Sequence, residues 1–173
     1  MEADEQKRAA YLETIKDISK DNQVYIDESG IDLNIAKERG WGKKGKILVG
    51  KKSGKYYQRT NIIAGYVGKK CIAPFTFNGK CNSELFNKWI EEVLIKDLKP
   101  GQVVIMDNAT FHKSERTKKL IEEAGCQLVY LPAYSPDLNP IEKYWAHMKR
   151  WLRENRVKFN ILLDAINQFL LIS

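Results

Sequence analysis

The sequence contains few of the residues from which disulfide frameworks and zinc sites are built. Its 173 residues include three cysteines and two histidines, and Cys71, Cys81 and Cys126 form no C-x-x-C pair. This odd, scattered set argues against a disulfide framework and against a zinc site. It fits buried or free thiols in a reducing compartment.

Long apolar runs are also missing. No stretch approaches the roughly 18 apolar residues that a membrane-spanning helix requires, and the charged N-terminal segment lacks the apolar centre of a signal peptide. Repeats and low-complexity tracts are absent as well. We therefore expect a soluble intracellular protein with no membrane partner.

The overall composition is that of one globular domain. Hydrophobic residues make up 43% and charged residues 29% of the chain, which is a balance typical of folded proteins. Lysine and arginine number 29 against 22 aspartates and glutamates, so the formal net charge is +7. An excess of this size suggests a polyanionic partner without establishing one.

Hydrophobic periodicity and turn signals predict a domain of the α/β class. The order is strand, antiparallel hairpin region, helix, buried strand, helix, strand, helix. Strands are expected at 24–26, from 47, and at 61–67, 71–77, 102–106 and 126–130. Helices are expected at 82–98, 114–124, from 140, and at 160–172.

The segment before the first strand has its own pattern. Residues 2–20 are highly charged and carry Tyr11, Leu12, Ile15 and Ile18 at helical spacing. This predicts an amphipathic helix that either packs on the domain or serves as a plain linker. We divide the chain accordingly into a helix or linker at 1–22 and a domain at 23–173.

Three carboxylates occupy positions where α/β domains build their sites. Asp27 follows a β-prone run, Asp107 follows a buried strand, and Glu142 falls in the first turn of a helix, with Asn139 as its expected N-cap and Pro140 as its first residue. Each acid alone has an ordinary explanation as a turn former, a cap or a helix start. Strand ends and helix starts nevertheless gather at one edge of such a sheet. Glu28 would point to the opposite face from Asp27, so we do not expect both to serve one site.

Carboxylates that converge repel one another unless cations lie between them. Oxygen ligands suit Mg²⁺ or Mn²⁺. Two such ions, about 3.5–4 Å apart, would support phosphoryl transfer by activating the attacking oxygen and stabilising the leaving oxygen.

A basic, glycine-containing loop lies between the first two carboxylates. Four cations and a tryptophan occur in it, namely Arg39, Trp41, Lys43, Lys44 and Lys46. The cations could bind phosphates and the tryptophan could stack on a base. A solvated basic loop with its tryptophan in the core explains the same pattern equally well.

Three blocks of sequence carry a family resemblance. They are Tyr-Ile-Asp-Glu-Ser at 25–29, Met-Asp-Asn-Ala-Thr-Phe-His at 106–112, and Tyr-Ser-Pro-Asp-Leu-Asn-Pro-Ile-Glu at 134–142 with Trp145. The chain resembles, over roughly residues 23–153, the catalytic domain of mariner-superfamily transposases and of the related bacterial insertion-sequence transposases. The 34 residues between Asp107 and Glu142 match the separation in one branch of that superfamily.

The resemblance implies a ribonuclease-H-like fold, in which helices flank a mixed five-stranded sheet. It implies that Asp27, Asp107 and Glu142 hold two Mg²⁺ or Mn²⁺ ions, with Asp27 bridging both. It also implies an enzyme that nicks DNA at the ends of a transposon and joins those ends to target DNA, in the bacterial cytoplasm near the nucleoid and as a homo-oligomer on DNA.

Other residues of the blocks have less defined roles. Asn108 could orient a ligand or cap the following turn, and His112 could reach a phosphate, lie near the metals or pack at a helix start. We expect Asp137 to shape its turn and Trp145 to lie in the core.

The chain departs from the family in one respect. Residues 1–24 are too few for the helix-turn-helix modules that precede the catalytic domain in full-length members, so another chain, an upstream reading frame or a lost part would recognise the transposon ends. The apolar C-terminal helix suggests that the C-terminus could be truncated as well. Two alternative functions stay open, namely a catalytically idle DNA-binding remnant that regulates a transposase, and another nuclease of the ribonuclease-H-like fold.

Overall fold

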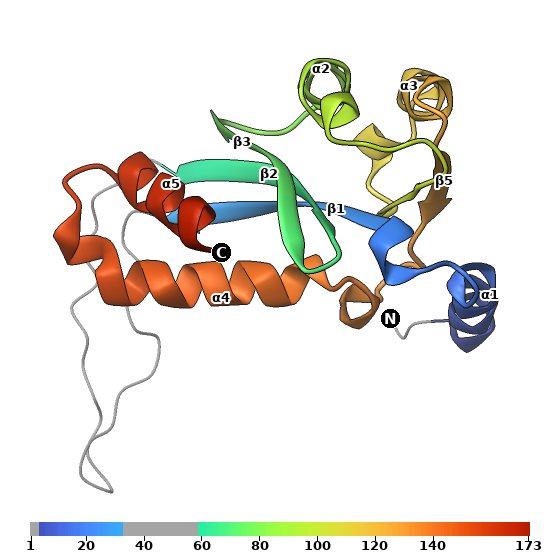
Figure 1. The fold of residues 1–173 in the computed structure, drawn as a ribbon, viewed down its shortest axis with the longest axis horizontal. Coiled ribbons are helices and arrows are strands. Elements are labelled where there is room, and N and C mark those ends of the chain that lie inside the picture. The colour runs from blue at the N-terminus through green and yellow to red at the C-terminus, as the bar shows by residue number, and fades with distance from the viewer. Residues whose placement is uncertain (1–3, 33–58) are drawn as a thin grey trace, which may run out of the picture.

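The computed structural model describes residues 4–32 and 59–173, and a mixed five-stranded sheet forms its centre (Figure 1). The strand order is β3-β2-β1-β4-β5. Strand β1 pairs antiparallel with β2 and parallel with β4, while β3 and β5 form the two edges. The strands are β1 Gln23–Asp32, β2 Arg59–Val67, β3 Lys70–Asn78, β4 Val103–Met106 and β5 Gln127–Tyr130.

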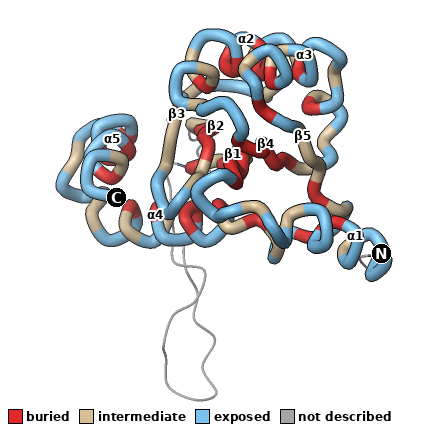
Figure 2. Tube along the Cα trace, turned by 45° about the vertical axis from the view of Figure 1, so that its right-hand side comes forward, coloured by how far each residue is buried: buried red, intermediate tan, exposed pale blue. Residues whose placement is uncertain are grey.

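Helices cover both faces of this sheet (Figures 1 and 2). One core joins α1, α4 and α5 to one face, and a second core joins α2 and α3 to the other. The helices are α1 Glu5–Ile15, α2 Ser83–Glu92, α3 Glu115–Glu123, α4 Ile141–Asn155 and α5 Leu162–Ile172. Short 3₁₀ turns lie between them: η1 Lys20–Asn22, η2 Leu94–Lys96, η3 Thr110–His112, η4 Pro136–Leu138 and η5 Arg156–Lys158. The predicted mixed sheet flanked by helices is confirmed.

Strand β1 is longer than the sequence suggested. It does not end at the two carboxylates, because β2 pairs with it as far as Asp32, opposite Arg59. Its parallel partner β4 stops earlier, at the pair Ile26 and Met106. Asp27 therefore lies inside the strand with respect to β2, and just beyond the last pair with respect to β4.

Helix boundaries differ from the predicted ones in two places. Helix α2 ends at Glu92 rather than near residue 98, because Val93 leaves the helical region with φ −122° and ψ −61° and a 3₁₀ turn follows. Helix α5 begins at Leu162 rather than at residue 160. Helix α3 agrees closely with its prediction, since the Ser114 side chain caps it and Gly125 follows it at φ +75°.

Helix α1 packs on the same face of the sheet as α4. Its Tyr11 is buried in that core and donates a 3.5 Å hydrogen bond to the hydroxyl of Tyr25. Arg8 forms a two-pronged ion pair with Asp137, at 2.9 and 2.6 Å. Leu12, expected on the apolar stripe, is instead 47% exposed.

Several predictions fall outside the described residues. They concern the strand expected from residue 47 and the basic loop with Arg39, Trp41, Lys43, Lys44 and Lys46. All three cysteines lie in the described part and none forms a disulfide, as expected. Within that part, the helices are too short or too polar for any of them to span a bilayer.

Candidate active site

The parallel pairing of β1 with β4 brings two aspartates together. Ile26 lies opposite Met106 in the last pair of the ladder, so the next residue on each strand is an aspartate: Asp27 and Asp107. Neighbouring strands lie about 4.8 Å apart. The two carboxylates therefore start from adjacent backbone positions at the same edge of the sheet.

The third acid comes from the loop that follows β5. Asn108, next to Asp107, donates a hydrogen bond from its side-chain amide to the carbonyl of Leu131 at the start of this loop. The backbone N–H of Asn139 bonds the carbonyl of Pro136 at 3.0 Å, and the N–H of Glu142 bonds the carbonyl of Asn139 at 3.2 Å. These bonds position Glu142 in the first turn of α4.

The three acids line one cavity of about 330 Å³. Asn108 and Asn139 line it too, and the rest of its wall comes from the backbone and side chains of the loops after β4 and β5. We call it the acidic cavity. In the part of the chain that the structure describes, no three His, Cys, Asp or Glu side chains are already gathered closely enough to hold a metal ion.

Asp27 lies in an environment that disfavours its charge. Burial raises its pKa to about 7, and the negative charges of Glu142, Glu28 and Asp107 add to this effect. Trp145 donates a hydrogen bond from Nε1 to Asp27 Oδ2 at 3.1 Å. This tryptophan is in the core as predicted, with 1% exposure, and its indole N–H also holds the carboxylate.

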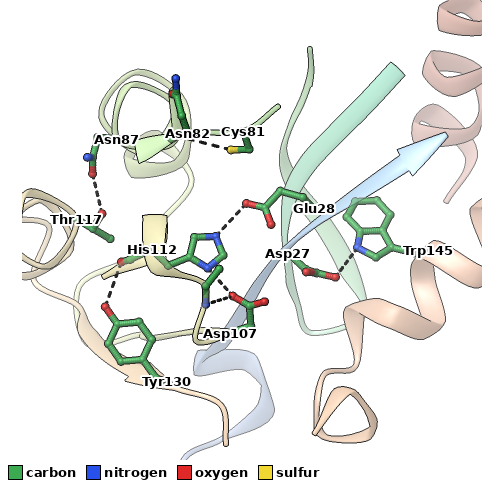
Figure 3. Close-up of polar contacts among 11 residues, drawn as sticks. Asp27, Glu28, Cys81, Asn82, Asn87, Asp107, His112, Thr117, Tyr130 and Trp145 are labelled. Carbon is green, nitrogen blue, oxygen red and sulfur yellow. Dashed lines mark hydrogen bonds and ion pairs between the residues drawn. The ribbon is translucent and has the colours of Figure 1, made fainter. Parts of the chain in front are cut away.

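A buried histidine connects Asp107 to Glu28 (Figure 3). His112 is fully buried, with Nδ1 2.7 Å from Asp107 Oδ1 and Nε2 3.0 Å from Glu28 Oε1. Burial alone would lower its pKa, but the hydrogen bonds and charges of the two carboxylates outweigh burial and raise the pKa to about 9. The same contact with His112 lowers the pKa of Asp107. The imidazole is therefore protonated at neutral pH and is held between two carboxylates.

Sequence reasoning missed the role of Glu28. It placed Glu28 on the opposite face from Asp27, away from the site, and Glu28 indeed does not line the acidic cavity. It reaches the site indirectly, because His112 lies between Glu28 and Asp107. The period-2 alternation of β1 was the available signal, but no local pattern links Glu28 to a histidine 84 residues away.

The predicted N-cap of α4 is wrong. Asn139 Oδ1 accepts no hydrogen bond in the described structure and is buried, and helix α4 begins at Ile141. The N–H of Glu142, from which a capping Asn139 side chain would accept, is bonded to the backbone carbonyl of Asn139 instead. Asn139 thus presents an unpartnered buried oxygen at the wall of the acidic cavity.

Asp137 lies on the same loop but does not line the cavity. Its carboxylate binds Arg8 of α1, and this hydrogen bond lowers its pKa. The loop that carries Glu142 is thereby tied to the N-terminal helix.

Comparison with known proteins gives a consistent result. The sequence profile of the family described as DDE superfamily endonuclease matches residues 22–163. The chain is 26% identical over 157 residues to an uncharacterized 39 kDa protein of insertion element IS630 from Shigella sonnei, which covers 87% of this chain and 45% of that protein.

Solved structures share the fold. A Mos1 transposase paired-end complex with the left transposon end has a TM-score of 0.68 at 18% identity, over 88% of this chain and 50% of that one. Mos1 paired-end complexes with Mn and with Mg have TM-scores of 0.67 and 0.66 at 16% identity, over 97% and 95% of this chain and 60% and 57% of theirs. The ribonuclease-H-like fold is confirmed. The chain spans about half the length of the relatives it matches.

Proposed function

The chain belongs to the DDE superfamily endonucleases, and from this premise we propose that it is the catalytic domain of a transposase that cleaves DNA and transfers the cleaved strand. The observation that carries the proposal is the acidic cavity, which Asp27, Asp107 and Glu142 line together. They come from three elements far apart in the sequence, two neighbouring strand ends and one helix start.

The residues of the acidic cavity fit divalent cations. Asp27 has its pKa raised by burial and by three neighbouring carboxylates, so the cavity holds negative charge that a cation would offset. The buried Oδ1 of Asn139 has no partner. Carboxylate and amide oxygens are hard donors of the kind that Mg²⁺ and Mn²⁺ prefer. The Mos1 structures solved with Mg and with Mn support the same choice of metal.

Asp27, Asp107 and Glu142 would hold two of these ions, and Asn139 would add a neutral oxygen to the set. When bound, such ions supply Lewis-acid activation of the attacking and leaving oxygens. Asp27 is the central ligand in this proposal, because the negative charges of both Glu142 and Asp107 raise the pKa of its carboxyl.

The remaining residues hold the acids in position. Trp145 fixes the orientation of the Asp27 carboxylate through Nε1. His112 holds Asp107 through a contact with Oδ1. The negative charges of Asp107 and Glu28 keep the imidazole of His112 protonated. Asn108 ties the loop after β4 to the loop after β5. In-line phosphoryl transfer depends on positioning, so these contacts serve the chemistry without touching the substrate.

The substrate in this proposal is DNA, and the net charge of +7 favours a polyanion. The relatives support the choice, since the Mos1 structure is a complex with a transposon end. We further propose that two or more copies assemble on the DNA and that another DNA-binding segment or chain selects the transposon ends.

A plasmid-nicking assay tests the proposal. Wild-type protein should nick supercoiled DNA in Mg²⁺ or Mn²⁺ and not in EDTA, and Asp107→Asn or Glu142→Gln should reduce the rate by about 10²-fold or more. The matched control is Asp137→Asn, which removes an acid from the same loop that does not line the cavity. It should retain nicking.

Equal rates for wild type and Asp107→Asn would contradict the proposal. Salt-sensitive DNA binding by a protein that never nicks in either metal would instead indicate a binding remnant. Faster cleavage of an RNA–DNA hybrid than of the plasmid would indicate a different nuclease of the same fold.

A further inference from the structure

A second cavity, of about 570 Å³, lies beside the acidic cavity on the α4 face of the sheet. Tyr25 and Tyr66, directly paired on β1 and β2, form part of its wall. Three lysines line it, one each from the 3₁₀ turn before β1, the β2–β3 turn and the first turn of α4: Lys20, Lys69 and Lys143. We call it the lysine cavity.

The charges of these lysines are not balanced. No ion pair in the described part of the chain involves Lys20, Lys69 or Lys143. Asp21 is the single acid that lines the cavity. Lys143 lies in the first turn of a helix, where the helix dipole favours negative rather than positive charge. The three exposed lysines outnumber the one acid in the lining, and this excess of positive charge favours an anion within the cavity.

The β2–β3 turn holds its lysine in a constrained backbone. Gly68 and Lys69 connect the two strands with φ of +53° and +69°, the combination that a two-residue hairpin turn requires. Lysine is an unusual choice at positive φ, where asparagine and glycine are favoured. A side chain at position 68 would be too close to Asp21, because a Cβ there would lie 2.7 Å from Asp21 Oδ1. Lys69 thus carries its cation at the β2–β3 turn in a backbone conformation that lysine seldom adopts.

The lysine cavity and the acidic cavity flank the same helix start. Pro140 and Lys143 line the first, and Asn139 and Glu142 line the second. On β1, Tyr25 lines the first and Asp27 the second. These two residues face the same side of the strand, about 7 Å apart. The start of α4 therefore lies between the two cavities, with its buried residues Ile141, Tyr144 and Trp145 packed against this face of the sheet.

We propose that the lysine cavity binds a backbone phosphate of the DNA strand that enters the acidic cavity on the other side of the α4 start. The inference rests on the proposed function and adds a site to it. Lysine ammonium groups neutralise phosphates in a sequence-independent way, and the exposed part of Tyr66 offers an apolar surface to the sugar. The strand would be anchored by positive charge on one side of α4 and cut on the other.

DNA binding measured without metal tests the site separately from catalysis. The full chain is titrated onto a fluorescent DNA duplex in EDTA at several salt concentrations, and binding is followed by anisotropy. The variant is Lys69→Asn with Lys143→Gln, because asparagine keeps the positive φ of the turn. The control is Lys118→Gln with Lys119→Gln, which removes the same charge from α3 on the other face of the sheet.

The affinity of the lysine-cavity variant for the duplex should be lower by roughly 10-fold or more near 0.1 M salt. The slope of log affinity against log salt should be reduced in magnitude by about 1 to 2. The α3 control should bind like wild type, and thermal melting should be alike for all three proteins. Equal binding by both double variants would overturn the lysine cavity and leave the nicking proposal intact. A wild type that binds no DNA at any salt concentration would overturn both.

Discussion

At the scale of single residues, Asp27 combines a structural disadvantage with a proposed functional role. Its carboxyl has a pKa of about 7 in the fold against an ordinary 3.8. Between these values the folded protein binds a proton that the unfolded chain has lost, so stability falls as pH rises through this window. Above about pH 7 the penalty is complete. A side chain retained at such a penalty is typical of a functional site.

We predict that Asp27→Asn stabilises the metal-free protein. Asparagine can still accept from Trp145 Nε1 but carries no charge, so at pH 8 in EDTA the melting temperature should rise by about 3–10 °C. The gain should vanish near pH 4, where aspartate is protonated in the fold. Calorimetry at both pH values measures this.

The control for that prediction is Asp137, whose pKa is shifted in the opposite direction from that of Asp27. Asp137 has its pKa lowered by Arg8, so Asp137→Asn should leave the melting temperature unchanged or slightly lower at pH 8. A lower melting temperature for Asp27→Asn at pH 8 would show that burial and repulsion do not destabilise this carboxylate.

His112 should give the fold a second, separate dependence on pH. Its pKa is about 9 in the fold against an ordinary 6.5, so its contribution to stability is complete below about pH 6.5 and is lost as pH rises through 9. We predict that the difference in melting temperature between wild type and His112→Gln is largest near pH 6 and shrinks towards pH 9.5. A difference that does not change with pH would mean that packing against Phe86 and Phe111, rather than the charge of His112, sets its contribution.

Sequence patterns singled out the three acids that line the acidic cavity, but not their contacts. Asp107 and Glu142 stand out because strand ends and helix starts are local features. The bond from Trp145 to Asp27 spans 118 residues, and only the fold brings its partners together. Asn139 was misassigned for a related reason, since the pattern Asn-Pro matches a helix cap whether or not the backbone has already used the N–H groups of the first turn.

At the scale of elements, α1 shows how a charged segment becomes part of the domain. Its sequence predicted an amphipathic helix but left open whether that helix packs. Two contacts of different kinds hold it: Tyr11, 5% exposed in the core, and Arg8, paired with the largely exposed Asp137. Burial of an aromatic ring contributes much more to stability than an exposed ion pair.

We therefore predict unequal effects for the two contacts. Tyr11→Ala should lower stability by about 3 kcal/mol, since it leaves a cavity and removes one of the two hydrogen bonds of the Tyr25 hydroxyl. Arg8→Ala should change the melting temperature by no more than about 2 °C. Chemical denaturation of both variants measures the difference. Equal losses would mean that the ion pair contributes as much as the core contact to docking the helix.

The extent of β1 could not be predicted from its own residues. Gly30 and the acids at 27 and 28 are weak strand formers, yet the strand continues to Asp32 because β2 pairs with it throughout. A tertiary partner overrode local propensity at the point where the site is built. This places Asp27 within a paired strand, where its carboxylate has a more rigid base than a turn would give.

At the scale of the whole molecule, the net charge and the charge of the acidic cavity have opposite signs. The chain carries a net charge of +7, yet its acidic cavity gathers three carboxylates. Net positive charge would attract the proposed DNA substrate from a distance, whereas the carboxylates would repel its phosphates at contact. In the proposed function, divalent cations would resolve this conflict, because they would bind the acids and make the cavity attractive to a phosphodiester.

Cation binding should consequently stabilise the fold, because the three acids meet only when the whole sheet and α4 are assembled. We predict that Mg²⁺ or Mn²⁺ raises the melting temperature of wild type, by about 5–10 °C at 100 times the dissociation constant. The shift should be retained in Asp137→Asn and lost in a variant with all three acids replaced by amides.

Asn139→Leu should melt higher than wild type without metal, since it removes a buried oxygen that has no partner, and should show a smaller shift with metal. If Asn139 has a purely structural role, Asn139→Leu should melt lower than wild type without metal, and metal should raise both melting temperatures equally. Thermal denaturation over a metal titration therefore separates the two roles.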